Sequence, residues 1–307
     1  MQCSTRPTAV QYGLRPGGLR YGHRVASTKK LVSALTRRGP HRVLRGDLAF
    51  AGVPGVVYTP EAGLNLPGVA FGHDWLAKAE NYTRTLEHLA SWGIVAGAPS
   101  TETGVAPSVL NFAFDLGATL DIVSGVRLGS GKISVHPGKR GLVGHGFGGS
   151  AAVFAAAGLA SGPQAPKAVA ALFPTVTKPE AEQPAATLKV PGLILASTGD
   201  PLNIRSNAAE LAAAWRGSTL RTVDKAESAG LVEGRKLSRF IGLPGPDRGT
   251  QKVVRALLTG YLLATLAGDK TYRDFADPEV VLPRTGFADP DAPPVQLEDK
   301  VAALLKG

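Results

Sequence analysis

The stretch that most constrains the fold of this 307-residue chain is residues 141–150, which read GLVGHGFGGS. A short apolar run leads into a cluster of glycines around His145 and Phe147, and an alanine-rich segment with helical character follows at residues 150–159. Glycines at such a turn let the backbone reverse tightly and let two elements approach closely, because glycine has no Cβ. The order strand, glycine turn, helix predicts an α/β fold with this turn at the carboxyl end of a strand.

The rest of the chain alternates between apolar runs and helical patterns, which predicts a single domain with a mostly parallel, doubly wound sheet. An antiparallel start is expected, because the first two apolar runs flank a turn-rich break. We expect Pro107 in the first turn of a long helix and a surface loop at residues 175–189. The expected strands are residues 43–50, 55–58, 66–71, 94–98, 168–173, 190–197 and 219–223, and the expected helices are residues 81–92, 106–126 and 250–267.

The two ends of the chain differ in composition from its centre. Residues 1–30 form a basic extension that we expect to be disordered, residues 31–275 form the domain, and residues 276–307 form a tail rich in Pro and Asp. A short helix is expected at residues 27–38, packed on the domain edge through Leu31, Ala34 and Leu35. A second is expected at residues 296–306 in the tail.

The formal net charge of +10 comes from the N-terminal part of the chain. Residues 1–46 hold ten of the 34 Lys and Arg residues and no Asp or Glu, so the other 24 cations balance the 24 acidic residues. This composition is typical of an organellar transit peptide, of a basic arm for nucleic acid or acidic lipid, or of a disordered extension. It also fits a translation start that has been assigned too far upstream. The sequence leaves these four interpretations open.

The glycine turn resembles the nucleophile elbow, G-x-S-x-G, of α/β-hydrolases. Its form G-H-x-x-G-G is most similar to the branch of dienelactone hydrolases and cutinase-like polyester (PET) hydrolases. The phrase HLASWGIVAGAP at residues 88–99 resembles a helix-to-strand passage of the same branch. The resemblance implies an α/β-hydrolase fold over roughly residues 40–275. It also implies a Ser or Cys nucleophile, where this chain has Gly146.

The resemblance also implies an oxyanion hole, a pair of backbone N–H donors that stabilise negative charge on a carbonyl oxygen. An apolar run enters Gly72 and His73, and this resembles the loop after the third strand of the hydrolase fold. The implied donors are the N–H of Phe147 and that of Asp74 or Trp75. His73 is read either as a residue beside the ligand or as a structural histidine bonded to nearby backbone.

The other two triad positions are implied by the later strands. Asp200 follows an apolar strand in a Gly-Asp-Pro turn, so it inherits the position of the triad acid, although such residues are common turn formers. The histidine position is empty, because residues 224–231 read DKAESAGL and no histidine follows His145. A hydroxyl without a base is a weak nucleophile, and here both are missing.

We therefore expect a hydrolase-like pseudoenzyme that binds a small carbonyl or carboxylate ligand or a protein partner. The alternative is a slow or rewired ester or lactone hydrolase, in which His145 acts on water with Asp200, Asp74 or Glu102. Ser150 lies a helical turn past the elbow and is read as a helix residue. Whether the chain is an enzyme is left open.

No cofactor or metal is expected, because the sequence has no His-x-x-x-His pair or cysteine cluster. The single cysteine, Cys3, excludes an intrachain disulfide and favours a reducing compartment. No apolar run reaches membrane-spanning length, since the strongest, residues 253–267, is short and contains Arg255. We expect a soluble, cytoplasmic protein, with nucleic acid or acidic lipid as partners only through the basic tail.

Overall fold

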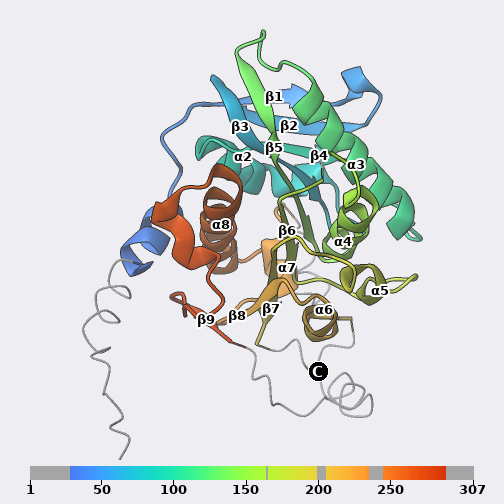
Figure 1. Cartoon of the computed structure of the whole chain (residues 1–307), viewed down its shortest axis with the longest axis vertical. Coiled ribbons are helices and arrows are strands. Elements are labelled where there is room, and N and C mark those ends of the chain that lie inside the picture. The colour runs from blue at the N-terminus through green and yellow to red at the C-terminus, as the bar shows by residue number, and fades with distance from the viewer. Residues whose placement is uncertain (1–27, 164, 199–204, 235–244, 288–307) are drawn as a thin grey trace, which may run out of the picture.

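The computed structural model describes residues 28–163, 165–198, 205–234 and 245–287. A single nine-stranded sheet runs through the molecule, with helices on both faces (Figure 1). The strands are β1 (Val43–Asp47), β2 (Gly55–Pro60), β3 (Gly63–Gly72), β4 (Val95–Pro99), β5 (Ile133–His145), β6 (Ala168–Leu172), β7 (Gly192–Ser197), β8 (Ser218–Val223) and β9 (Thr285–Gly286).

The strands lie in the order β1-β2-β4-β3-β5-β6-β7-β8-β9. All pairs from β4 to β8 are parallel, while β1 pairs with β2, and β2 with β4, in antiparallel fashion. The expected α/β class, mostly parallel sheet and antiparallel start are thereby confirmed. The antiparallel pairing of β9 with β8 was not anticipated, because β9 lies in a segment read as tail.

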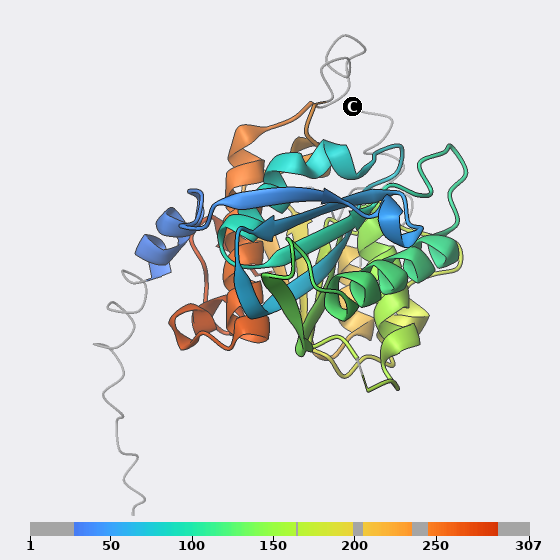
Figure 2. The ribbon, with the colours of Figure 1, turned by 90° about the horizontal axis from the view of Figure 1, so that it is seen from above.

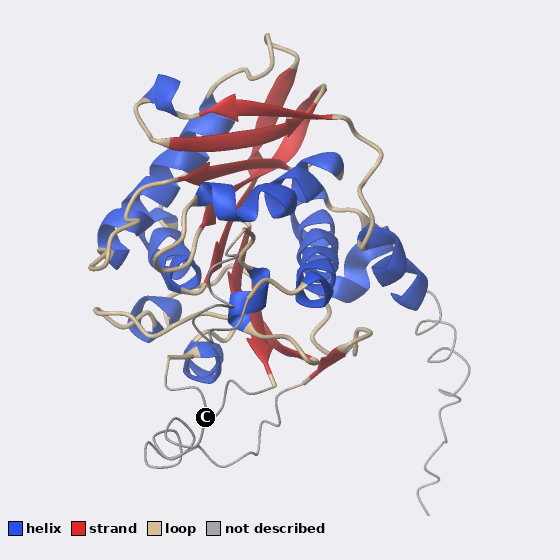
Figure 3. Cartoon of the chain, turned by 180° about the vertical axis from the view of Figure 1, so that it is seen from behind, coloured by secondary structure: helices blue, strands red, loops and turns tan. Residues whose placement is uncertain are grey.

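The sheet separates two apolar cores, and helices cover both of its faces (Figures 2 and 3). On one face lie α2 (Thr83–Ser91) and α8 (Arg248–Leu262), and on the other lie α3 (Val109–Gly125), α4 (Phe147–Leu159), α5 (Glu182–Ala185) and α6 (Ala208–Ala214). Strands covered on both faces must be apolar throughout, and every residue of β6 and β7 is buried.

Several expected elements differ in their bounds. Pro107 lies outside α3, because the Ser108 hydroxyl accepts the N–H of Asn111 and makes Ser108 the N-cap. The run from residue 43 stops as a strand at Asp47, and a 3₁₀ turn, η1 (Ala49–Ala51), follows. Residues 175–189 contain the short helix α5 as well as loop.

The remaining short elements join the helices to the sheet. They are η2 (Ala79–Tyr82) before α2, α7 (Ser228–Leu231) after β8, the π-helical turn η5 (Leu263–Ala267) after α8, and η6 (Lys270–Phe275). The helix expected at residues 27–38 is present over residues 28–35. It buries Val32 and Leu35 on the core, while Ala34 is exposed, so that part of the expectation was wrong. The helix expected at residues 296–306 lies outside the described residues.

Candidate functional site

The turn between β5 and α4 has the geometry that its glycines require. Gly146 adopts φ 54° and ψ −119°, a conformation strained for any residue with a side chain. A Cβ on Gly144 would overlap the carbonyl oxygen of Gly148, and a Cβ on Gly148 would overlap the backbone of Gly72. The turn thus brings the ends of β3 and β5 against the first turn of α4, with backbones in direct contact.

The side chain of Asp74 lies in the space that a side chain at Gly146 would need. A Cβ built on Gly146 would overlap Oδ1 and Cγ of Asp74. The same Oδ1 accepts the backbone N–H of Phe147 at 3.0 Å. This N–H is one of the donors implied for an oxyanion hole, so in this structure the donor is satisfied by the protein's own carboxylate.

The second implied donor is the backbone N–H of Asp74 or that of Trp75. The N–H of Asp74 donates to the phenol oxygen of Tyr82 at 3.1 Å, so this donor already has a partner within the protein. The Trp75 side chain is 37% exposed, its indole N–H donates to the carbonyl of Val105, and the guanidinium of Arg205 lies 5.6 Å from its ring centre. Trp75 therefore lines the surface next to Asp74.

His145 is fully buried and is bound through both ring nitrogens. Its Nδ1 lies 2.7 Å from Tyr82 Oη, and its Nε2 lies 2.9 Å from the hydroxyl of Ser228. The ring also meets Phe173 edge to face. The partner of Nε2, Ser228, lies in the segment of residues 224–231, where the resemblance implied a histidine.

His73 is also fully buried, and its surroundings are those of a structural histidine. Nδ1 lies 2.9 Å from the carbonyl oxygen of Asp74, and Nε2 lies 2.8 Å from that of Thr101. The ring packs against Phe112 at a tilt of 44°. Burial lowers the pKa of His73, although both carbonyl contacts act to raise that pKa. The side chain fixes the loop after β3 and so holds Asp74 in position.

The other candidates serve the scaffold or cannot be placed. Glu102 accepts the N–H of Ser108 at 2.6 Å and so anchors the segment before α3. Ser150 is buried in α4 and donates its hydroxyl to the carbonyl of Thr175 at 2.6 Å, as expected for a helix residue. Asp200, the implied triad acid, lies outside the described residues.

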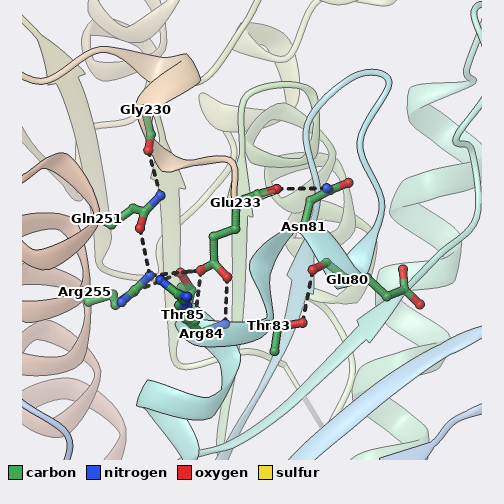
Figure 4. Close-up of polar contacts among 9 residues, drawn as sticks. All are labelled: Glu80, Asn81, Thr83, Arg84, Thr85, Gly230, Glu233, Gln251 and Arg255. Atoms are coloured by element: carbon green, nitrogen blue, oxygen red, sulfur yellow. Dashed lines mark hydrogen bonds and ion pairs between the residues drawn. The ribbon is translucent and has the colours of Figure 1, made fainter. Parts of the chain in front are cut away.

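A network around Glu233 fastens the segment after β8 to α2 (Figure 4). The Glu233 carboxylate accepts the N–H groups of Arg84 and Thr85 at the start of α2, where helix N–H groups lack intrahelical partners. It also binds the Arg255 guanidinium of α8 at 2.9 Å, with both side chains nearly buried. Asn81 exchanges hydrogen bonds with the Glu233 backbone. Ser228 is therefore held opposite His145 by a fixed segment.

The roles of Tyr82 and Ser228 and the reach of the Asp74 side chain were not anticipated from the sequence. Together with the expected residues they form one continuous series of hydrogen bonds, from Phe147 N–H to Asp74, from Asp74 N–H to Tyr82, and on through His145 to Ser228. The position of Ser228 in the sequence could have indicated its role. A hydroxyl residue stood in the segment that the resemblance had marked for a histidine.

The described residues include no group of three or more His, Cys, Asp or Glu side chains arranged to hold a metal ion. None of their helices combines the length and the apolar character needed to cross a membrane. A comparison with protein-family models finds no match, and a comparison with curated proteins finds none either.

Proposed function

We propose that this chain is an α/β-hydrolase-fold protein, derived from the dienelactone and polyester hydrolase branch, that does not turn over esters at its elbow. The support for the hydrolase fold is the position of three turns. The Gly72-His73 turn follows β3, the glycine elbow follows β5, and the turn expected to carry the histidine follows β8. An elbow between strand and helix, with a donor loop after the third strand, is the arrangement of that fold.

The observation that carries the proposal is the Asp74 carboxylate at Gly146. It fills the space of the missing nucleophile and binds the N–H of Phe147 at 3.0 Å. An ester carbonyl that approached this N–H would meet a bound carboxylate and no hydroxyl. His73 and His145 are both buried and hydrogen-bonded within the fold, so neither is positioned to activate a water there.

The ligand we propose is a small molecule with a carbonyl or carboxylate group, or alternatively a protein partner that covers this surface. A small ligand can use the Phe147 N–H only by displacing the Asp74 carboxylate. The carboxylate therefore acts as an internal competitor of the ligand. We expect Asp74→Ala to bind small carboxylates more tightly than the wild type, because it removes both the occupying oxygen and a like charge.

The test is hydrolysis of a short activated ester by the wild type, Gly146→Ser, His145→Ala and the double variant Gly146→Ser/Asp74→Ala. We expect no variant to release more than one equivalent of product per chain, since a serine at residue 146 would still lack a base. Sustained wild-type turnover that His145→Ala abolishes would instead establish the rewired hydrolase.

Residues 1–27, which hold most of the basic tail, lie outside the described residues. Binding to nucleic acid or acidic vesicles that survives deletion of residues 1–30 would exclude a role for the tail.

A further inference from the structure

Ser228 and His145 form a hydroxyl–imidazole pair that the elbow does not use. Ser228 begins α7, after the loop of residues 224–227 that follows β8, and its Oγ lies 2.9 Å from His145 Nε2. On the other side of the ring, Nδ1 lies 2.7 Å from Tyr82 Oη. A nucleophile within hydrogen-bond reach of a base, with the base oriented by a third group, is the general arrangement of an activated hydroxyl.

We infer that Ser228 is a nucleophilic serine, activated by His145, that accepts an acyl group from activated esters. Tyr82 is a positioning residue that holds the imidazole. This site is separate from the elbow, where Asp74 fills the nucleophile space. The inference therefore goes beyond the proposed function and does not depend on it.

The hydrogen bonds around Tyr82 allow the tautomer that a base needs. A phenol oxygen can accept more than one hydrogen bond, so Tyr82 Oη can take the N–H of Asp74 and that of His145 Nδ1 together. With the proton on Nδ1, the lone pair of Nε2 faces the Ser228 hydroxyl. This is the arrangement in which imidazole removes a hydroxyl proton.

The burial of Ser228 and His145 determines whether the pair can turn over an ester or is acylated only once. The Ser228 residue is partly exposed, whereas His145 and Tyr82 are fully buried, so an acyl donor would have to approach from the Ser228 side. Hydrolysis of an acyl-serine would require a water next to His145 Nε2. Because His145 is fully buried, we expect no water to reach Nε2 beside an acylated Ser228. The expected product is a stable acyl-serine, formed once per chain without turnover.

The reaction balances without an added reagent. Ser228 Oγ attacks the carbonyl carbon of the ester, and the hydroxyl proton passes to His145 Nε2. The tetrahedral intermediate then expels the alkoxide or phenoxide, which takes up that proton. The products are an ester on Ser228 and one molecule of alcohol or phenol, and His145 returns to its neutral form.

The segment that carries Ser228 is held rigidly, as a preorganised nucleophile requires. The Gly230 N–H donates to the carbonyl of Glu227, and the Gly230 carbonyl accepts the side-chain amide of Gln251 at 3.1 Å. Beyond α7, Glu233 ties the chain to α2 and α8. Ser228 therefore faces His145 without rearrangement of the fold.

The experiment uses the full chain and p-nitrophenyl acetate. The release of p-nitrophenol is followed, and the acetylated peptides are mapped by mass spectrometry. We expect a burst of about one equivalent, with the acetyl group on Ser228. Ser228→Ala should abolish the burst. Ser124→Ala should retain it, because the Ser124 hydroxyl donates to the backbone carbonyls of Leu120 and Asp121 rather than to an imidazole.

Two further variants test the role of the imidazole. His145→Gln should slow acetylation at least tenfold, and Tyr82→Phe, which keeps the ring and removes only Oη, should slow it by a smaller factor. Acetylation spread over lysines and unchanged in Ser228→Ala would overturn the inference. An unchanged rate in Tyr82→Phe and in folded His145→Gln would overturn it as well. Turnover beyond one equivalent that persists in Ser228→Ala would contradict the proposed function of the elbow. Turnover that Ser228→Ala abolishes would contradict the stable acyl-serine, and the mapped position of the acetyl group decides whether Ser228 is the nucleophile.

Discussion

The carboxylate of Asp74 occupies the position that a side chain on Gly146 would take, although 71 residues separate the two in the sequence. Restoring a serine at the elbow is therefore more than a change of one side chain. The new Cβ meets Asp74, and residue 146 keeps a positive φ of 54° that only glycine adopts without strain.

We expect Gly146→Ser to lower the free energy of unfolding by about 1–3 kcal/mol, from backbone strain and displacement of Asp74. In Gly146→Ser/Asp74→Ala the loss should be smaller than the sum of the two single losses, because the overlap is removed. Urea denaturation of the four proteins measures this coupling. Additive losses would contradict the overlap.

Two glycines of α4 provide a matched pair. A Cβ at Gly148 would overlap the backbone of Gly72, whereas a Cβ at Gly158 meets nothing within 4 Å. We expect Gly148→Ala to abolish stable folding or to cost more than about 4 kcal/mol. Gly158→Ala should stabilise the protein by up to about 1 kcal/mol, because alanine is the better helix former. Thermal melting of both variants provides the test, and equal effects would exclude the close approach at the elbow.

The ion pair of Glu233 and Arg255 should matter far more than a surface pair. Glu233→Ala leaves Arg255 nearly buried without its carboxylate and removes two acceptors from the start of α2, so we expect a loss of about 3 kcal/mol. Arg42 and Glu61 form an exposed pair at 3.6 Å, and Arg42→Ala should change stability by less than about 1 kcal/mol. Chemical denaturation of the two variants and the wild type measures both changes in the free energy of unfolding. Similar losses would show that the Glu233 network carries little stability.

Stability should decrease in mild acid because of His88. Burial, aided by the charge of Arg255, lowers the pKa of His88 from 6.5 to about 4. Between these values the unfolded chain takes up a proton that the folded protein resists. Stability is complete above pH 6.5 and is lost as the pH falls towards 4, by about 3 kcal/mol from this residue. Denaturation curves across this range measure the loss. His88→Gln should flatten the dependence, and an unchanged dependence would contradict the assignment.

Helices and strands were predictable from the sequence where an apolar run or a glycine cluster marks them directly. The apolar runs of β6 and β7 indicate strands covered on both faces, and the glycine cluster around residue 146 indicates a tight turn between strand and helix. Bounds were less predictable where a side chain competes for backbone groups. The cap by Ser108 moves the start of α3 past Pro107.

The site was predictable only in its backbone. The direction of the Asp74 side chain depends on the loop that His73 fixes after β3, and no local pattern encodes it. The pairing of His145 with Ser228 joins residues 83 positions apart. His145 ends β5 and Ser228 follows β8, and β6 and β7 lie between these two strands in the sheet. Such a contact depends on the assembled sheet and its loops, which the periodicity of a single strand does not determine.

The Glu233 network also has a consequence for the order of folding. Its bonds to Arg84 and Thr85 join segments about 150 residues apart, so they can form only after the intervening strands have assembled. The two amide hydrogens should therefore exchange with solvent whenever the segment after β8 detaches, even while the sheet stays intact. Hydrogen exchange at Arg84 and Thr85 would thus measure how often the segment after β8 detaches from α2.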